Sequence, residues 1–215
     1  MNLIIFGPQG SGKGTYASLI SPKLGITHIS SGDIFRDAIR NQTALGKEIE
    51  DFLKKGILVP DEITIQVMKE RFSQPDLAKG FILDGFPRTM KQAEELERAV
   101  KIDAVINLVV PEWILLERLS HRVTCEHCKR IYNLLNRKPK KDGVCDNCGG
   151  RLIQRSDETP EAIRQRLRQY RENSEPLIEY FKKRLTVIDS EVNDIDSDAE
   201  LIAQSIIEKL KKIEI

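Results

Sequence analysis

The strongest constraint on the fold is the start of the chain, where a short apolar segment runs directly into a glycine-rich loop. "MNLIIF" is a continuous apolar run that ends at Gly7, which is typical of a buried parallel strand. The loop contains Gly10 and Gly12 and leads into a helix that is expected to end near Lys23, with Gly25 just beyond it. A strand, a tight loop and a helix in this order predict parallel strands connected by helices.

The rest of the chain continues this alternation. Further strands are expected over residues 27–30, 80–88, 103–110 and 185–189, and further helices over 61–72, 89–100, 111–120, 160 into the 170s, and 198–212. Pro176 is expected to kink or restart the long helix after 160. We therefore predict an α/β fold, built on a five-stranded parallel sheet with helices on both faces.

Two segments break the alternation and are interpreted as inserts on that core. Residues 31–59 contain only helical patterns, with breaks near 41–43 and at Gly56, and residues 122–155 hold all the cysteines. No internal repeat or flexible linker separates them from the core. We assign residues 1–29, 60–121 and 160–215 to the core, 30–59 to a first insert and 122–159 to a second.

Composition excludes several classes of protein. Lys plus Arg number 34 and Asp plus Glu number 33, so the net charge of +1 gives no reason to expect wholesale binding to nucleic acid or membranes. No apolar run approaches the roughly 18 residues that suggest a membrane span. The first apolar run is followed by a lysine and lacks a cleavage region, so no secretory signal is expected. The sequence predicts a cytoplasmic protein.

The four cysteines form two Cys-x2-Cys pairs with 16 residues between them, as "CEHC" at 125–128 and "CDNC" at 145–148. This spacing is typical of a zinc ribbon, in which two knuckles present four sulfurs to one Zn²⁺. Four thiolates leave no position open for water, so the predicted zinc is structural. Reduced free thiols or a redox pair are the alternatives. The predicted ligands are Cys125, Cys128, Cys145 and Cys148.

The glycine-rich loop carries the clearest chemical signal. "GPQGSGKG" fits Gly-x4-Gly-Lys, a loop whose backbone N–H groups surround phosphates at a helix N-terminus, with Lys13 as a positive charge. A glycine-rich turn without ligand is the alternative, and a dinucleotide-binding turn is disfavoured because Gly-x-Gly-x-x-Gly does not occur. Gly14 stands where Ser or Thr usually follows the lysine, and Thr15 comes next.

The motifs together resemble one family. "GKGT" at 12–15, "SSGDIFR" at 30–36, "DGFPRTMKQ" at 84–92 and the arginines between 154 and 166 are similar to adenylate kinases, in particular to the long form with a zinc-binding lid. The resemblance covers essentially the whole chain. It implies a P-loop NTPase-type fold, an AMP-binding insert at 30–59, a lid at 122–159, and phosphoryl transfer from Mg-ATP to AMP, giving two ADP. It also implies Mg²⁺ with ATP, and we expect a monomer.

The resemblance also implies which residues serve each nucleotide. Arginines suit this chemistry because their planar fork holds phosphate through two bonds and stays charged. For ATP the matching residues are Gly10, Ser11, Gly12, Lys13, Gly14, Thr15, Arg118 and Arg122. For AMP they are Ser31, Arg36, Ile57, Leu58, Val59, Gly85, Arg88, Gln92, Arg155 and Arg166, with Gln92 reading the adenine edge. The catalytic set is Lys13, Arg88, Arg122, Arg155, Arg166 and Asp84, with Asp84 as a water-mediated partner of Mg²⁺ and Asp157 between the last two arginines.

Some positions depart from the family pattern. Gln9 replaces a proline in the loop, and Ser31 replaces a threonine. His121 and Val123 stand where glycine and a second arginine are common, so Val123 is expected to have no role toward phosphate. The stretch "DSEVN" at 189–193 lacks the usual glycine turn beside the ATP base, which leaves the preference for the donor base open.

Two other functions stay open at this point. One is a sister kinase that acts on UMP or CMP, or that uses GTP as donor, although Gln92 and the long lid argue against it. The other is a nucleic-acid-binding protein whose basic zinc ribbon carries Lys138, Lys140 and Lys141. Tyr132 is the sole aromatic residue of 122–155, so no base-stacking platform is evident there.

The lid explains why a phosphate-handling chain would carry cysteines. Residues 122–155 contain nine Lys or Arg and three Asp or Glu, and four thiolates with one Zn²⁺ leave a charge of about +4. A 34-residue basic segment buries little apolar surface of its own. A zinc cross-link holds such a segment in shape, so that it closes over ATP as one body and excludes water.

Overall fold

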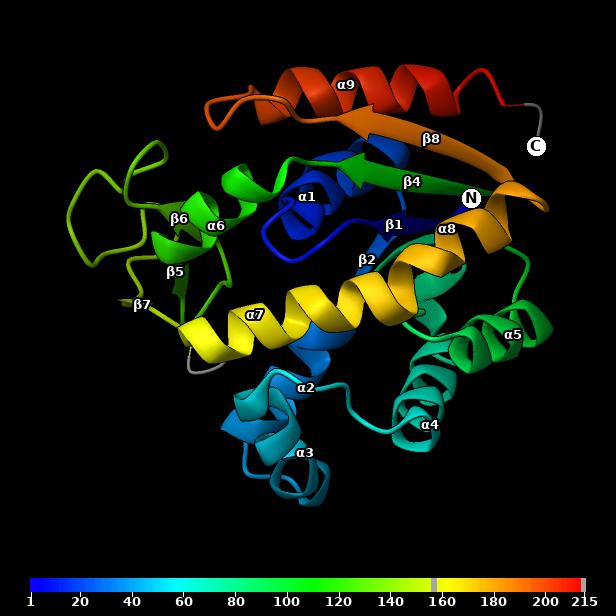
Figure 1. Cartoon of the computed structure of the whole chain (residues 1–215), viewed down its shortest axis with the longest axis horizontal. Coiled ribbons are helices and arrows are strands. Elements are labelled where there is room, and N and C mark those ends of the chain that lie inside the picture. The colour runs from blue at the N-terminus through cyan, green and yellow to red at the C-terminus, as the bar shows by residue number, and fades with distance from the viewer. Residues whose placement is uncertain (156–157, 214–215) are drawn as a thin grey trace.

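The central sheet of the computed structural model confirms the predicted α/β class. The structure describes residues 1–155 and 158–213, so Asp157 lies outside the described residues. Its five parallel strands are β1 (Asn2–Phe6), β2 (Thr27–Ser30), β3 (Phe81–Asp84), β4 (Ala104–Val109) and β8 (Thr186–Glu191). They lie in the order β2-β3-β1-β4-β8, which puts β1 at the centre of the sheet. Figure 1 shows β1 between β2 and β4, with β8 beyond β4.

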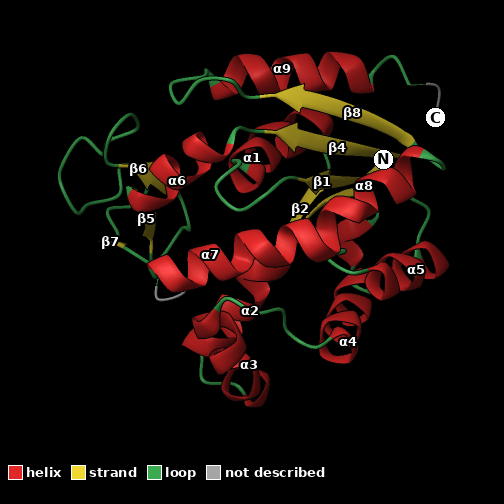
Figure 2. Cartoon of the chain, viewed as in Figure 1, coloured by secondary structure: helices red, strands yellow, loops and turns green. Residues whose placement is uncertain are grey.

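Helices cover both faces of this sheet (Figure 2). The core helices are α1 (Lys13–Leu24), α4 (Asp61–Phe72), α5 (Met90–Ala99), α6 (Glu112–Ser120), α7 (Pro160–Gln169), α8 (Glu175–Lys182) and α9 (Ala199–Leu210). Ile20 of α1 and Ile206 of α9 are buried with Ile106 against one face. Met68 of α4 and Phe181 of α8 are buried in the apolar cluster on the other face.

The long helix after residue 160 is interrupted where the sequence predicts it. A π-helical segment, Tyr170–Ser174, separates α7 from α8, and Pro176 lies in the first turn of α8. The helix continues through this π-helical turn, in which the N–H of Glu175 donates to the carbonyl of Tyr170, and Pro176, which has no N–H to donate, follows directly. A short 3-10 turn, Pro75–Leu77, precedes β3.

The first insert consists of two helices, α2 (Ser31–Arg40) and α3 (Ala44–Lys55). The side chains of Ser30 and Thr43 cap their N-termini, and Gly56 ends α3 in the left-handed conformation with φ 68°. A Cβ at Gly46 would lie 2.1 Å from the carbonyl oxygen of Ala38, so glycine lets the two helices meet closely. The predicted breaks at 41–43 and at Gly56 are confirmed.

The second insert contains a separate antiparallel sheet of β5 (Arg122–Cys125), β6 (Ile131–Asn133) and β7 (Leu152–Ile153), in the order β6-β5-β7. Two polar contacts between described residues join this lid to the first insert. Lys129 Nζ lies 2.8 Å from Asp37 Oδ1, and Arg40 Nη1 donates to the carbonyl of Glu126 at 2.7 Å. The division of the chain into core, insert and lid stays a prediction, although both inserts coincide with separate elements.

In the described part of the chain, no helix has the length and apolarity to cross a membrane.

Candidate functional site

A cleft of about 740 Å³ lies at the carboxyl ends of the central strands. Its walls come from the loop after β1, the end of β3, both helices of the first insert, the lid and α7. In open parallel sheets, ligands bind at this edge, where neighbouring strands connect to opposite faces. The volume lies within the range of ligand sites in proteins. The core, the insert and the lid therefore share one candidate site.

The loop from Gly7 to Gly12 forms the floor of this cleft. Gly10 and Gly12 have φ values of 86° and 96°, and α1 begins at the next residue. A Cβ at Gly12 would lie 2.9 Å from Cε2 of Tyr16, so both the positive φ and the lack of space require glycine at this position. The N–H groups at the start of α1 and the helix dipole favour an anion here.

Lys13 folds back over the loop. Its ammonium donates to the carbonyl oxygens of Gly7 at 2.7 Å and Pro8 at 3.0 Å. Burial is the main cause that lowers the pKa of Lys13 to about 8; the negative charge of Asp84 opposes this shift, and the positive charges of Arg88, Arg122 and Arg166 contribute to it. These cations, from three separate parts of the chain, therefore surround one point above the phosphate loop.

Asp84 is the acidic group of the cleft. It ends β3, its side chain is 14% exposed, and its Oδ2 lies 3.7 Å from Nε2 of His28 on β2. Burial alone would raise the pKa of Asp84, but His28 and the positive charge of Lys13 hold it below its ordinary value. The carboxylate is therefore ionised at neutral pH. His28 was not predicted as a site residue, because nothing in the strand "THIS" distinguishes it from a solvated histidine.

The first insert and the loop after β3 supply a second group of polar side chains. Arg36 Nη2 donates to Asp33 Oδ1 at 2.8 Å, and Arg88 Nε donates to the carbonyl of Gly85 at 2.8 Å. Ser31 Oγ donates to the same carbonyl at 2.7 Å. Burial raises the pKa of Asp33, but the Arg36 guanidinium brings it below its ordinary value. Both arginines line the cleft, Arg36 from α2 and Arg88 from the loop after β3.

Gln92 of α5 is the polar residue with the least exposure on this side, at 1%. Its Oε1 accepts from the backbone N–H of Arg88 at 2.8 Å. Its Nε2 donates to Asp61 Oδ1 at 2.7 Å. Gln92 also lines the cleft, so its amide is held in a fixed position at the cleft wall.

An acid that the sequence did not reveal holds the base of the lid. Glu158 has a fully buried side chain and is ion-paired with Arg122 of β5. Arg155 Nη1 lies 4.0 Å from the same carboxylate, and Arg155 Nε donates to Thr124 Oγ1 at 3.1 Å. Acids are almost never fully buried unless they are paired. The available signal was an acid directly before Thr159, which caps α7, but that pattern is common at helix starts.

Arg118 reaches a loop near the C-terminus. Its Nη2 lies 3.3 Å from the carbonyl oxygens of Asp194 and Ile195, and Asn136 Nδ2 of the lid donates to Ile195 at 2.6 Å. This loop follows the stretch 189–193, which the structure places at the end of β8. It forms the rim of the cleft on the side of the phosphate loop.

Nearly all the predicted nucleotide-binding residues line the same cleft. Ser11 is the exception, because it is completely buried and lies beneath the loop, where its Oγ would be 2.6 Å from a Cβ at Gly7. Val123 is not among the lining residues and packs beside Cys125 and Tyr132. The predicted residues found in the wall are Gly10, Gly12, Lys13, Gly14, Thr15, Ser31, Arg36, Ile57, Leu58, Val59, Asp84, Gly85, Arg88, Gln92, Arg118, Arg122, Arg155 and Arg166.

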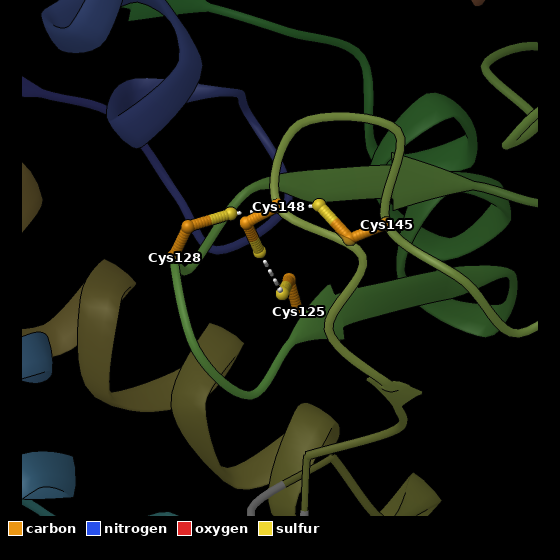
Figure 3. A group of neighbouring side chains, drawn as sticks. All are labelled: Cys125, Cys128, Cys145 and Cys148. Atoms are coloured by element: carbon orange, nitrogen blue, oxygen red, sulfur yellow. Dashed lines mark hydrogen bonds between the residues drawn. The ribbon is translucent and has the colours of Figure 1, made fainter.

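The four cysteines lie outside the cleft and converge on one point (Figure 3). Their Sγ atoms all lie within 4.8 Å of one another, and the closest pairs, Cys125–Cys148 and Cys128–Cys145, are 3.5 Å apart. A tetrahedral zinc with Zn–S bonds of about 2.3 Å requires sulfurs about 3.8 Å apart. The group therefore fits a metal ion, which supports the predicted metal ligands.

Comparison with known proteins places this geometry in a family. The adenylate kinase family model matches residues 5–186. An adenylate kinase of Archaeoglobus fulgidus is 48% identical over 98% of this chain and 100% of the relative. A relative of the same name from Caldicellulosiruptor saccharolyticus is 49% identical over 86% of this chain and 88% of the relative. Another, from Kosmotoga olearia, is 43% identical over 99% of this chain and 100% of the relative.

The chain belongs to the adenylate kinase family. The resemblance that the motifs predicted is confirmed, and with it the P-loop type of fold. Family membership also carries the reaction, so this enzyme transfers a phosphoryl group between adenine nucleotides. The relatives' names favour this reaction over that of a sister kinase for pyrimidine nucleotides.

Proposed function

We propose that the cleft binds Mg-ATP on the phosphate loop and AMP between the first insert and α5, and that the phosphoryl group passes between them above Lys13. The observation that carries this proposal is the convergence of Lys13 with arginines of the core, lid and α7 around one cleft. Phosphoryl transfer needs in-line positioning and positive charge around the equatorial oxygens, with little covalent work by the protein. This cleft supplies the positive charge, and its shared walls would position the two nucleotides.

On the donor side, the loop from Gly10 to Thr15 would hold the ATP phosphates through its backbone N–H groups. Lys13 is already held near its working position by two backbone carbonyls, so little reorganisation is needed when phosphate replaces them. Arg118 and Arg122 would close over the same phosphates from α6 and β5. The rim near Ile195, fixed by Asn136, would lie beside the donor base.

On the acceptor side, Arg36 and Arg88 would hold the AMP phosphate, and Ser31 would add a hydrogen bond. The apolar wall of Ile57 to Val59, with Gly85, would face the nucleoside, and Gln92 would read the edge of the base. Arg155 and Arg166 would reach the phosphate that is transferred. The ion pairs with Glu158 place Arg155 and Arg122 side by side at the base of the lid.

Two metals complete the proposal. Asp84 would hold Mg²⁺ through water, and its ionised state and position at the end of β3 support this. Mg²⁺ neutralises phosphate charge when it is bound. Cys125, Cys128, Cys145 and Cys148 would hold one structural Zn²⁺, because four sulfurs leave no position for a reacting water.

The lid also supports exclusion of water. Its contacts with the first insert, Lys129 to Asp37 and Arg40 to Glu126, close the cleft on the side away from the sheet. Removing water prevents hydrolysis of ATP and strengthens the electrostatic interactions inside. Tyr132, the aromatic residue that a nucleic-acid-binding ribbon would use, is 2% exposed and offers no face for stacking. The cytoplasmic location and the monomeric state stay predictions.

The test is a panel of acceptors. Purified protein is incubated with Mg-ATP and, separately, with AMP, UMP, CMP or GMP, and the products are separated by chromatography. Rapid formation of ADP with AMP alone supports the assignment of Gln92 as the base reader. Turnover of another monophosphate at a similar rate would overturn that assignment while leaving the phosphate machinery in place.

A further inference from the structure

The presence of Gln92 in the motif "DGFPRTMKQ" does not by itself determine which purine its amide can recognise. A glutamine amide has an acceptor and a donor of nearly the same shape, and rotation about its last bond exchanges them. One orientation pairs with a purine that carries a 6-amino group. The other pairs equally well with a purine that carries a 6-oxo group. A glutamine discriminates between these bases only when something fixes its orientation.

Two neighbouring groups fix the orientation of the Gln92 amide, because one can only donate a hydrogen bond and the other can only accept one. The backbone N–H of Arg88 donates to Oε1 and cannot accept. The carboxylate of Asp61 accepts from Nε2 and cannot donate. Turning the amide over would place a donor against the N–H and an acceptor against the carboxylate. Since Gln92 is 1% exposed, water has little access to its amide, and buried amide atoms that face mismatched partners are costly.

Asp61 is in turn held in place. It is the first residue of α4, where a negative charge is favoured by the helix dipole. Thr89 Oγ1 lies 3.0 Å from each of its carboxylate oxygens, so the hydroxyl fixes the plane of the carboxylate. Asp61 is not among the residues that line the cleft. It therefore acts on the base through Gln92 and not by contact.

The fixed amide has one N–H and one lone pair left for a ligand. Those groups complement adenine, whose N1 accepts and whose 6-amino group donates. Hypoxanthine and guanine present the reverse pattern, a 6-oxo acceptor and an N1–H donor. We propose that Asp61 is a specificity-determining positioning residue, whose carboxylate holds the Gln92 amide in the orientation that accepts 6-aminopurine monophosphates and rejects 6-oxopurine monophosphates. This rests on the proposed function, in which Gln92 reads the acceptor base.

The test compares AMP with inosine monophosphate, because the two differ only at the 6-position and at the N1 proton. In Asp61→Asn the new amide can present either its oxygen or its nitrogen to Gln92, so one of the two constraints on orientation is removed. We expect the ratio of kcat/KM for inosine monophosphate to that for AMP to rise about tenfold, mainly through KM. Calorimetric binding of both monophosphates should show the same change in ratio.

Glu62→Gln is the matched control. Glu62 follows Asp61 in the first turn of α4, is exposed, and pairs with Lys91, so this change removes the same charge without touching Gln92. Its ratio of inosine monophosphate to AMP should equal that of the unmodified enzyme. A merely structural role of Asp61 would lower activity with both substrates and leave the ratio unchanged.

A second variant separates this proposal from the one on which it rests. Gln92→Leu should abolish the preference for AMP if Gln92 reads the base. If Gln92→Leu loses that preference while Asp61→Asn keeps the original ratio, the role of Asp61 is overturned and the base reader stands. If Gln92→Leu keeps the preference, the base reader itself is wrong. Should Asp61→Asn fail to fold by circular dichroism, Thr89→Val removes the hydroxyl that orients the carboxylate and that also caps α5 at the backbone N–H of Gln92. Loss of the cap alone should lower activity with both substrates without changing their ratio. A smaller rise in the ratio is expected if Asp61 is released, and an unchanged ratio overturns the proposal.

Discussion

The two inserts meet the same requirement by different means. Each is a short segment outside the core that must keep its shape while it presents arginines to the cleft. The first insert has a small apolar core of its own, formed by Phe35, Ile49, Leu53 and Val59, and its helices are capped by Ser30 and Thr43. The lid buries Cys125, Tyr132 and Cys145, and its strands are two to four residues long.

The difference follows from composition. Residues 30–59 contain enough apolar side chains at helical spacing to bury a stripe between two helices. The lid is rich in Lys and Arg, whose charges repel one another and favour water. A metal cross-link stabilises such a segment without apolar burial. A lid that must be basic toward ATP is therefore better stabilised by a metal than by an apolar core.

The largest expected effect comes from Lys13, to which the lid brings the positive charge of Arg122. Lys13→Met should lower kcat by about 10³-fold or more, because the ammonium stabilises charge on the transferred phosphoryl group. It should also stabilise the fold at pH 7. The pKa of Lys13 is about 8 in the folded protein, so its charge opposes folding below pH 8, and this cost disappears as pH rises toward 10.5.

Thermal melts between pH 7 and 10.5 check this prediction. We expect Lys13→Met to be more stable than the unmodified enzyme by about 1–2 kcal/mol at pH 7, a gain that shrinks at higher pH. Lys23→Met, on the exposed end of the same helix, is the control and should change neither quantity strongly. A variant that is less stable at pH 7 would show that the two carbonyl hydrogen bonds outweigh the cost of burial.

Removal of the metal tests the lid alone. Chelation of Zn²⁺ should loosen the lid and lower the melting temperature by roughly 10–20 °C, because the sulfurs then have no cross-link. Metal analysis and a circular dichroism melt of the same sample measure both quantities. Cys145→Ser should melt at the lower temperature already and respond no further to the chelator. An unchanged melt after verified metal loss would contradict the structural role.

An equivalent destabilisation of the first insert involves its apolar core. Leu53→Ala should lower the free energy of unfolding by about 2–4 kcal/mol, because a buried side chain leaves a cavity between α3 and its neighbours. That corresponds to roughly 5–10 °C in melting temperature. The KM for AMP should rise more than the KM for ATP. Equal rises would mean that the insert also shapes the donor side.

The smallest effect is expected where the two inserts touch. Lys129→Met removes the ion pair between Lys129 and Asp37. Both side chains are partly exposed, so the free energy of unfolding should fall by less than about 1 kcal/mol. We expect roughly a twofold fall in kcat/KM at low salt that disappears at high salt. Lys138→Met, an exposed lysine of the same lid, is the control. A salt-independent fall in Lys129→Met would indicate lost packing instead of a lost ion pair.

Local patterns predicted most of the secondary structure. The strand and loop before Lys13, the breaks at residues 41–43 and at Gly56, and the interruption before Pro176 all depend on neighbours in the sequence. Glycine and proline act on their own backbone, and apolar spacing is visible in one dimension. The cysteine pairs are similarly local, since each knuckle needs only four consecutive residues.

The partners of the site residues were not predictable in the same way. Glu158 beside Arg122, His28 beside Asp84 and Asp61 beside Gln92 each join segments that are 31 or more residues apart. None of these partners belongs to a motif that specifies its contact. Each acquires its role from burial, which turns a common polar residue into a paired one.

The sequence by itself determined the parallel α/β class, the phosphate loop, the two cysteine pairs and the family. The tertiary structure alone decided the strand order, the cleft shared by core, insert and lid, and the partners of three site residues: Glu158 beside Arg122, His28 beside Asp84 and Asp61 beside Gln92. The physical reason is the separation along the chain of the residues that determine each feature. Backbone conformation and metal knuckles depend on adjacent residues, whereas the charge and orientation of a buried side chain depend on whatever distant segment the fold brings against it.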